Sequence, residues 1–274
     1  MTSAAPSTRP RNLVTWADLQ IRRLRTFVED VGAATLLAGR TFRTMFTTRF
    51  DTSEFIYQLE QLGVRSLAIA AATAIFVGIV MTIQFAVSME AFGAKDTLGR
   101  VIAVSEAREL APSLTALVVG SRIAAGIAAE LGSMTVTEQV DAIRALGADP
   151  IRKLVVPRLI ACIVIMPLIT FVAFILGMIS SMLVAALSYG IPIEFFFSTA
   201  LDSLQINDFV SGVAKTPFFG FLIALLGCYF GLQTRGGTEC VGRSTTRAVV
   251  VVSISILMAD ALLTQIFVDR KSVV

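Results

Sequence analysis

The chain has 274 residues, of which 55% are hydrophobic and 16% are charged, whereas soluble domains average roughly 45–50% and 25%. This composition argues against an ordinary soluble domain and predicts an all-α integral membrane protein. The net charge is only +3, there is no histidine, and the three cysteines (Cys162, Cys228 and Cys240) have no paired spacing, which argues against a zinc site, a histidine base and a disulfide framework.

The segment before the first apolar stretch predicts a tail and an amphipathic arm. We expect residues 1–11 to be a disordered tail, with no cleaved signal peptide. Residues 12–48 carry charges every few positions and so are not a crossing, yet apolar residues recur at three and four: Phe27, Val31, Ala34, Ala38, Phe42 and Met45. This helix either lies in the cytoplasmic headgroup layer, which we favour, or packs on the rest of the protein. With the elbow that follows, residues 12–62 form the interfacial part.

Five stretches are long and apolar enough to cross a membrane. Each has about 20 or more mostly apolar residues, which suffices for a hydrocarbon core of about 30 Å. They are residues 67–87, 110–129, 159–187, 209–232 and 248–268. We find no internal repeat and no second domain, so residues 63–268 are predicted to be a single transmembrane domain.

The distribution of lysine and arginine predicts the orientation. Basic residues concentrate before the first crossing, in residues 134–158 and in residues 233–247, whereas the connection at 188–207 has none. By the positive-inside rule the N-terminus and the two basic connections are cytoplasmic. An odd number of crossings then places the C-terminus outside, although Arg270 and Lys271 argue weakly against this.

The second crossing is unusual because it contains charges. They are Glu106, Arg108, Glu109, Arg122 and Glu130. A charge at the bilayer centre costs roughly 2.5–3.5 kcal/mol, so these side chains should not face lipid unpaired. Pro112 has no backbone N–H, and it predicts a bend or break in the helix near these charges. Two interpretations are open: a polar cavity near residues 106–112, or internal ion pairs near the outer interface with an ordinary proline kink.

The second crossing also repeats small residues every four positions. They are Ser121, Ala125 and Ala129, with Gly120, Ala124 and Ala128 beside them. This spacing lets helix backbones approach closely, so the helix packs deep in the bundle or against a second copy of the chain.

A polar segment, "MTVTEQVDAIRALGADPIRKLVVPR" at residues 134–158, interrupts the apolar chain. Thr135 and Glu138 have capping-box spacing, which predicts a helix that begins at residue 135 and ends at Gly147, over about 135–147. Its apolar face comprises Val136, Val140 and Ile143. From this segment alone, a surface helix in a loop is the simplest interpretation.

Lys215 and Asp260 are lone charges in the fourth and fifth crossings. Each could pair with a charge of the second crossing, and a Lys215–glutamate pair is the simplest way to keep both groups in the membrane. Whether such a pair touches cargo or only holds helices together is left open by the sequence, and we favour the structural role.

The run from "ARELAPSLT" to "KLVVPR", residues 107–158, closely resembles the signature region of the MlaE/YrbE family, the permease subunits of MCE-associated lipid ABC transporters. Within it, "TEQVDAIRALGADP" is the most specific part. Later stretches, "GVAKTPFFG", "GRSTTRAVV" and "ADALLT", also agree, so the resemblance covers roughly residues 50–268. One departure is Ala111, which stands where the family's "RELGP"-type motif commonly has glycine.

The resemblance implies a transport permease, not an enzyme, in the bacterial inner membrane. It would move phospholipid or a related lipid between that membrane and an MCE-protein conduit, with a role in outer-membrane lipid asymmetry. The implied partners are a second copy of the chain, a cytoplasmic ABC ATPase with or without a small STAS-domain subunit, a periplasmic MCE-domain ring and the lipid cargo, but no nucleic acid. ATP and Mg would bind the ATPase, with no cofactor in this chain.

The resemblance also assigns residues, none of them catalytic or metal-binding. It places Arg108 and Glu109 in the family's cavity lining. Together with Pro112 and the other intramembrane charges, they make up the candidate lipid-cavity or intramembrane charged set: Glu106, Arg108, Glu109, Pro112, Arg122, Glu130, Lys215 and Asp260. The polar helix corresponds to the family's coupling helix, seated in a groove of the ATPase. Its candidate contacts are Thr135, Glu138, Gln139, Asp141 and Arg144.

Two other functions compete with the permease. One is a membrane-embedded enzyme acting on lipid with intramembrane glutamates as acid–base groups, which lacks a nucleophile–base pair. The other is an ion or proton pathway built on Glu106, Glu109, Glu130, Lys215 and Asp260, whose mark would be conductance without an ATPase. The chain has no G-x-x-x-x-G-K-[ST] loop, so any ATP is bound by another polypeptide.

Overall fold

The computed structural model describes residues 16–47 and 52–271, with side chains described over 29–45 and 52–267. The tail expected at residues 1–11 lies outside this range. In the part described, all regular structure is helical, and the protein is an all-α integral membrane protein. The α-helices are α1 (Trp16–Thr47), α2 (Thr52–Leu59), α3 (Arg65–Ala91), α4 (Leu98–Ser105), α5 (Thr115–Val136), α6 (Gln139–Ala145), α7 (Val156–Tyr189), α8 (Ile193–Ser203), α9 (Ile206–Leu232) and α10 (Thr238–Lys271).

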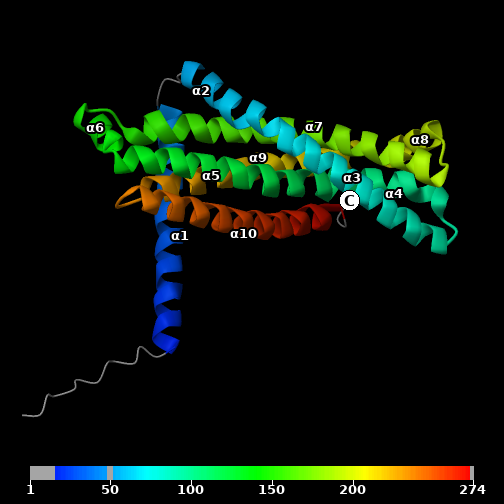
Figure 1. Ribbon diagram of the computed structural model, residues 1–274, viewed down its shortest axis with the longest axis horizontal. Coiled ribbons are helices and arrows are strands. Elements are labelled where there is room, and N and C mark those ends of the chain that lie inside the picture. The colour runs from blue at the N-terminus through cyan, green and yellow to red at the C-terminus, as the bar shows by residue number, and fades with distance from the viewer. Residues whose placement is uncertain (1–15, 48–51, 272–274) are drawn as a thin grey trace, which may run out of the picture.

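Within the described residues, five helical rods are long and apolar enough to cross a membrane, as the sequence predicts. Three contain short turns of other helix types: π-helical η1 (Glu60–Val64), η3 (Glu106–Leu114) and η4 (Ile151–Val155), and 3₁₀-helical η2 (Lys95–Thr97). The rods are Thr52–Ala91, Lys95–Val136, Ile151–Tyr189, Ile206–Leu232 and Thr238–Phe267. They lie side by side, with α6 at one end of the bundle and α8 at the other (Figure 1).

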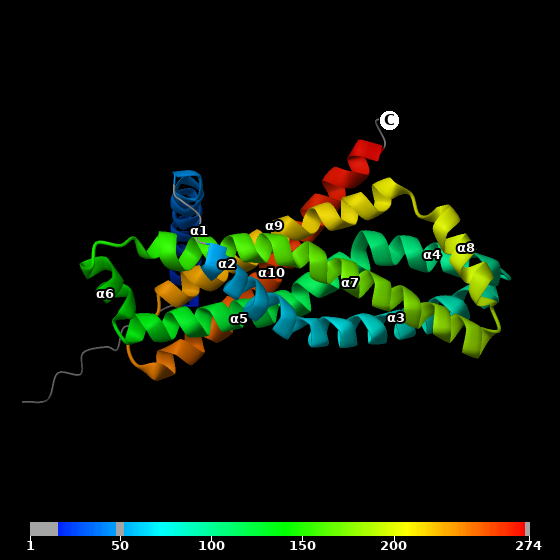
Figure 2. The same ribbon diagram turned by 90° about the horizontal axis from the view of Figure 1, so that it is seen from above.

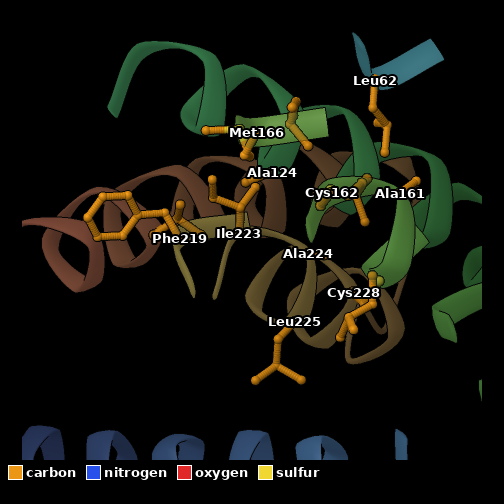
Figure 3. Close-up of a cluster of buried hydrophobic side chains, with 14 of the residues drawn as sticks. Leu62, Ala124, Ala161, Cys162, Met166, Phe219, Ile223, Ala224, Leu225 and Cys228 are labelled. Atoms are coloured by element: carbon orange, nitrogen blue, oxygen red, sulfur yellow. The ribbon is translucent and has the colours of Figure 1, made fainter. Parts of the chain in front are cut away.

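The core of the bundle forms where α5 and α7 pack on α9. Phe219 and Ile223 of α9 lie with Ala124 and Met166 in one buried cluster (Figure 3). Small residues permit this packing, because a Cβ atom added to Gly227 would lie 3.3 Å from the Cα atom of Ala124. The small-residue stripe of the second crossing is therefore used, at least in part, to bring α5 against α9 within one chain.

α1 runs perpendicular to the bundle near its α6 end, in both views (Figures 1 and 2). It is held by an apolar contact around buried Ala34 and by a hydrogen bond of 2.9 Å from the Tyr229 hydroxyl to Asp30 Oδ1. The predicted apolar stripe is only partly buried, because Val31 and Phe42 are 49% and 58% exposed. Phe27 lies outside the described side chains. α1 thus packs on the bundle and also has the direction of a helix lying along a membrane surface.

Of the bend or break predicted at Pro112, the break does not occur. Residues Lys95–Val136 form one continuous helical rod, and Pro112 lies inside η3. In a π-helical turn the hydrogen bonds span five residues instead of four, so the chain changes its register here without ending the helix. π-helical turns of this kind are frequent at functional sites.

The predicted start of the polar helix at Thr135 is also wrong. α5 continues through Thr135, whose hydroxyl donates back to the carbonyl oxygen of Leu131 at 2.8 Å instead of capping a new helix. Glu138 then adopts a left-handed conformation with φ of 59°, and α6 begins at Gln139. The predicted end of the polar helix at Gly147 is close to the observed one. α6 ends at Ala145, and Gly147 has φ of 77°, the left-handed conformation of a glycine that follows a helix.

Candidate functional site

Lys215 of α9 is the centre of a cluster of charged side chains inside the bundle. The residue is 2% exposed. Its Nζ atom lies 2.9 and 3.0 Å from the two carboxylate oxygens of Glu109 and 3.3 Å from Asp260 Oδ1. It also donates to Thr264 Oγ1 at 2.7 Å. The predicted pairing of Lys215 with a glutamate of the second crossing is confirmed, and Asp260 joins it.

Hydroxyl groups complete this cluster. Ser113 Oγ donates to Asp260 Oδ2 at 2.7 Å, and Thr264 Oγ1 lies 3.2 Å from Glu109 Oε1. Lys215 Nζ further approaches the carbonyl oxygen of Arg108 at 3.4 Å. The network therefore joins η3, α9 and α10, and its two carboxyl groups face a single ammonium group. Ser113 and Thr264 were missed from the sequence, because hydroxyl residues are common in apolar helices and nothing local distinguishes these two.

Arg108 pairs with Asp208, a residue that the sequence did not indicate. Its Nε and Nη2 atoms lie 3.0 and 2.6 Å from Asp208 Oδ1. The two side chains differ in exposure, with 37% for Arg108 and 4% for Asp208. Asp208 stands in the first turn of α9, just before the predicted start of the fourth crossing at residue 209, where an acidic residue at a helix start is ordinary.

Glu106 and Glu109 face different helices although they share one π-helical segment. Glu106 is 1% exposed and faces α7, since a Cβ atom added to Gly177 would overlap its carboxylate. Its Oε2 atom has no hydrogen-bond partner in the described part of the chain. Glu109 instead faces α9 and α10 through Lys215.

Arg122 and Glu130 are also separate from the Lys215 cluster. Arg122 Nη1 donates to Ser66 Oγ of α3 at 2.7 Å. Glu130 Oε1 pairs at 2.8 Å with Arg158 Nη2, and the buried Arg158 also donates to the carbonyl oxygen of Leu154. The structure thus gathers Glu109, Lys215 and Asp260, and leaves the other candidate charges in distinct contacts. Over residues 16–47 and 52–271, no three His, Cys, Asp or Glu residues form a possible metal site.

α6 presents a polar surface at the end of the bundle. Val140 is 3% exposed and Ile143 packs against the same core. Gln139, Asp141 and Arg144 are exposed, and the Asp141–Arg144 ion pair of 2.7 Å lies entirely within the helix. Of the other predicted contacts of this segment, Glu138 is exposed but Thr135 is only half-exposed on α5. The arrangement leaves the polar side of α6 available to another protein.

The described part of the chain has several membrane-crossing helices, ionisable groups paired between them and a polar helix at one end of the bundle. These features are typical of a transport permease rather than of an enzyme. Comparison with known proteins gives the family. The family model described as Permease MlaE matches residues 55–266, and the chain belongs to the MlaE permease family.

Curated relatives agree with this assignment. A probable ABC transporter permease of Synechocystis is 40% identical over 237 residues, covering 86% of this chain and 90% of the relative. One from Rickettsia felis is 36% identical over 246 residues, with 90% and 95% covered. The Arabidopsis thaliana protein TRIGALACTOSYLDIACYLGLYCEROL 1, chloroplastic, is 38% identical over 232 residues, 85% of this chain and 66% of that protein. The chain is a multi-pass membrane permease, not itself an enzyme, and its class implies an ATPase partner.

Proposed function

We propose that the chain is the permease subunit of an ABC transporter that moves phospholipid or a related lipid between the bacterial inner membrane and an MCE-protein conduit to the outer envelope. Two copies form the permease. A cytoplasmic ATPase, with or without a STAS-domain subunit, binds ATP and Mg, and an MCE-domain ring docks on the outer side. The family match supports the permease, and the name of the Arabidopsis relative contains that of a glycerolipid, which supports a lipid cargo.

The single observation that carries this proposal is the packing of α6. Val140 and Ile143 attach the helix to the bundle, and its polar side faces outward. A permease without a nucleotide-binding loop must receive the energy of ATP through a protein contact. α6 offers such a contact, and Glu138, Gln139, Asp141 and Arg144 are its proposed residues.

Arg108 is the proposed contact for the lipid headgroup. Its two bonds to Asp208 use Nε and Nη2, and guanidinium has five N–H donors in all. Because the side chain is 37% exposed, its remaining donors can reach a phosphate. Lys215 and Asp260 are less exposed than Arg108, and they contact η3 from α9 and α10.

The proposed transport step couples α6 to η3. Closure of the ATPase pair would move α6, which follows directly on α5, and α5 is continuous with η3 in the rod Lys95–Val136. A push at the α6 end would thereby reach residues 108–112 and expel lipid from a cavity between the two copies. The positive-inside rule supports placing the α6 end in the cytoplasm and the C-terminus in the periplasm.

The first test is purification of the tagged chain from native membranes, with mass spectrometry of the co-purifying proteins and extracted lipids. We expect an ATPase and an MCE-domain protein in stoichiometric amounts, with phospholipid or sterol bound. A lone chain in mild detergent that conducts ions without an ATPase would instead favour the ion pathway.

The second test reverses the charge of α6. In Glu138→Arg/Asp141→Arg we expect about tenfold less ATPase recovered with the permease and a matching loss of ATP-dependent lipid transport, because reversing two charges on the contact face removes its electrostatic complementarity to the partner. The control is Glu239→Arg, which reverses an exposed acidic residue at the start of α10 that pairs with Arg243. Unchanged assembly and transport in the double variant would exclude the proposed coupling of α6 to η3.

A further inference from the structure

A groove lies between α1 and the C-terminal end of α9, at a distance from the Lys215 cluster. It has a volume of about 340 Å³. Leu36 and Leu37 of α1 and Leu232 of α9 line it together with two arginines, Arg40 of α1 and Arg235 of the α9–α10 connection. The groove therefore combines apolar walls with two positive charges.

The two arginines differ from three of the cations inside the bundle. Arg108, Arg158 and Lys215 each contact a carboxylate. Arg40 and Arg235 are both exposed, and their side chains make no ion pair or hydrogen bond with the described part of the chain. Two unpaired guanidinium groups in one groove are suited to an anion, and phosphate is the anion whose geometry guanidinium matches best.

The position of the groove indicates where that phosphate comes from. α1 lies across the rods near the α6 end, so it is parallel to the membrane surface if the rods cross the bilayer (Figures 1 and 2). Leu36 is 68% exposed and Phe42 is 58% exposed, although α1 is too charged to be a crossing. Exposed apolar side chains beside arginines on such a helix are typical of one seated between headgroups and acyl chains.

The groove also depends on a fixed position of α1. The hydrogen bond from Tyr229 to Asp30 and the buried cluster that Ala34 shares with Tyr229 and Phe230 hold α1 on α9. The groove is therefore formed before any ligand binds, with residues of α1 and of the α9–α10 connection already next to each other.

We propose that this groove binds an anionic phospholipid of the leaflet next to α6, with Arg40 and Arg235 contacting the phosphate and the leucines contacting the acyl chains. This lipid is a bound component and not the transported cargo. Tyr229 and Lys215 are 14 residues apart on one helix, which is about 21 Å along its axis, so the groove and the Lys215 cluster are separate sites. The proposal requires only that the chain is embedded in a bilayer and does not rest on the transport function.

The test is native mass spectrometry of the detergent-solubilised complex titrated with phosphatidylglycerol, with phosphatidylcholine or with inorganic phosphate. A basic residue near an anionic lipid surface contributes about fivefold in affinity. We therefore expect Arg40→Gln/Arg235→Gln to weaken phosphatidylglycerol binding by roughly 25-fold, with little change for phosphatidylcholine. The Arg40→Lys/Arg235→Lys variant keeps the charge but loses the planar fork of donors, so it should bind phosphatidylglycerol more weakly than the parent and more tightly than the glutamine pair.

The matched control is Arg65→Gln/Arg152→Gln, which removes the same charge from two exposed positions that do not line the groove. An equal loss in the control pair would overturn the proposal in favour of general surface charge. Inorganic phosphate that binds as tightly as phosphatidylglycerol and displaces it would show a free-phosphate site. A co-purifying protein that crosslinks to position 235 and excludes lipid would show a protein interface.

A single variant keeps the test possible if the double variant does not fold. Arg235 lies in the connection between α9 and α10, so Arg235→Gln should leave the helices intact and lower the affinity for phosphatidylglycerol about fivefold.

Discussion

The charges around Lys215 and the charges on α6 are the same kinds of residue with opposite surroundings. Lys215 is 2% exposed and contacts Glu109 and Asp260 on two other rods. In α6, Asp141 and Arg144 are 66% and 62% exposed, and within the described residues they pair with each other. An unpaired charge in hydrocarbon is costly, whereas an ion pair in water contributes little. The inner charges therefore hold helices together, and the outer ones are free to recognise a partner.

The largest effect is expected for Lys215→Met. This change removes the cation shared by Glu109 and Asp260, whose side chains are 41% and 17% exposed. Because both carboxylates keep some access to solvent, we expect a cost of about 3 kcal/mol, the lower end of the range for breaking a buried pair. Thermal unfolding of the detergent-purified protein measures it. The neutral triple variant Lys215→Met/Glu109→Gln/Asp260→Asn should recover much of the loss, and a single variant as stable as the parent would show that the cluster does not hold the rods together.

A smaller effect is expected for Gly212→Ala, which tests the close approach that brings η3 to α9. An added Cβ atom would overlap the carbonyl oxygen of Ala107, a backbone atom that cannot rotate aside. Overpacking of this kind costs about 1–3 kcal/mol. The matched control is Gly126→Ala, where nothing lies within 4 Å of the added atom, so alanine should stabilise the helix by up to about 1 kcal/mol. Equal effects at the two positions would contradict the close packing of η3 on α9.

The smallest effect on stability is expected for Arg144→Gln in α6. The Asp141–Arg144 pair is exposed, so its loss should change the free energy of unfolding by less than about 0.5 kcal/mol. The same variant should reduce the recovery of the ATPase with the permease. A loss of stability comparable to that of Lys215→Met would remove the distinction between the two groups of charges.

The sequence by itself determined the five crossings, the amphipathic arm and the polar segment between the second and third crossings. These features depend on local composition, because the bilayer requires about 20 apolar residues from each crossing. The need for Lys215 to find an acidic partner was also foreseeable from the cost of a lone charge in lipid.

Only the tertiary structure decided which charges meet. Arg108 contacts a carboxylate 100 positions away, and Lys215 contacts Glu109 across 106 positions. Glu106 faces α7 while Glu109 faces α9 and α10, a division that depends on where the π-helical turns rotate the side chains. Thr135 likewise has the spacing of a helix cap but stays inside α5. Hydropathy is a property of a segment, whereas the direction and partner of a side chain are set by the helices that surround it.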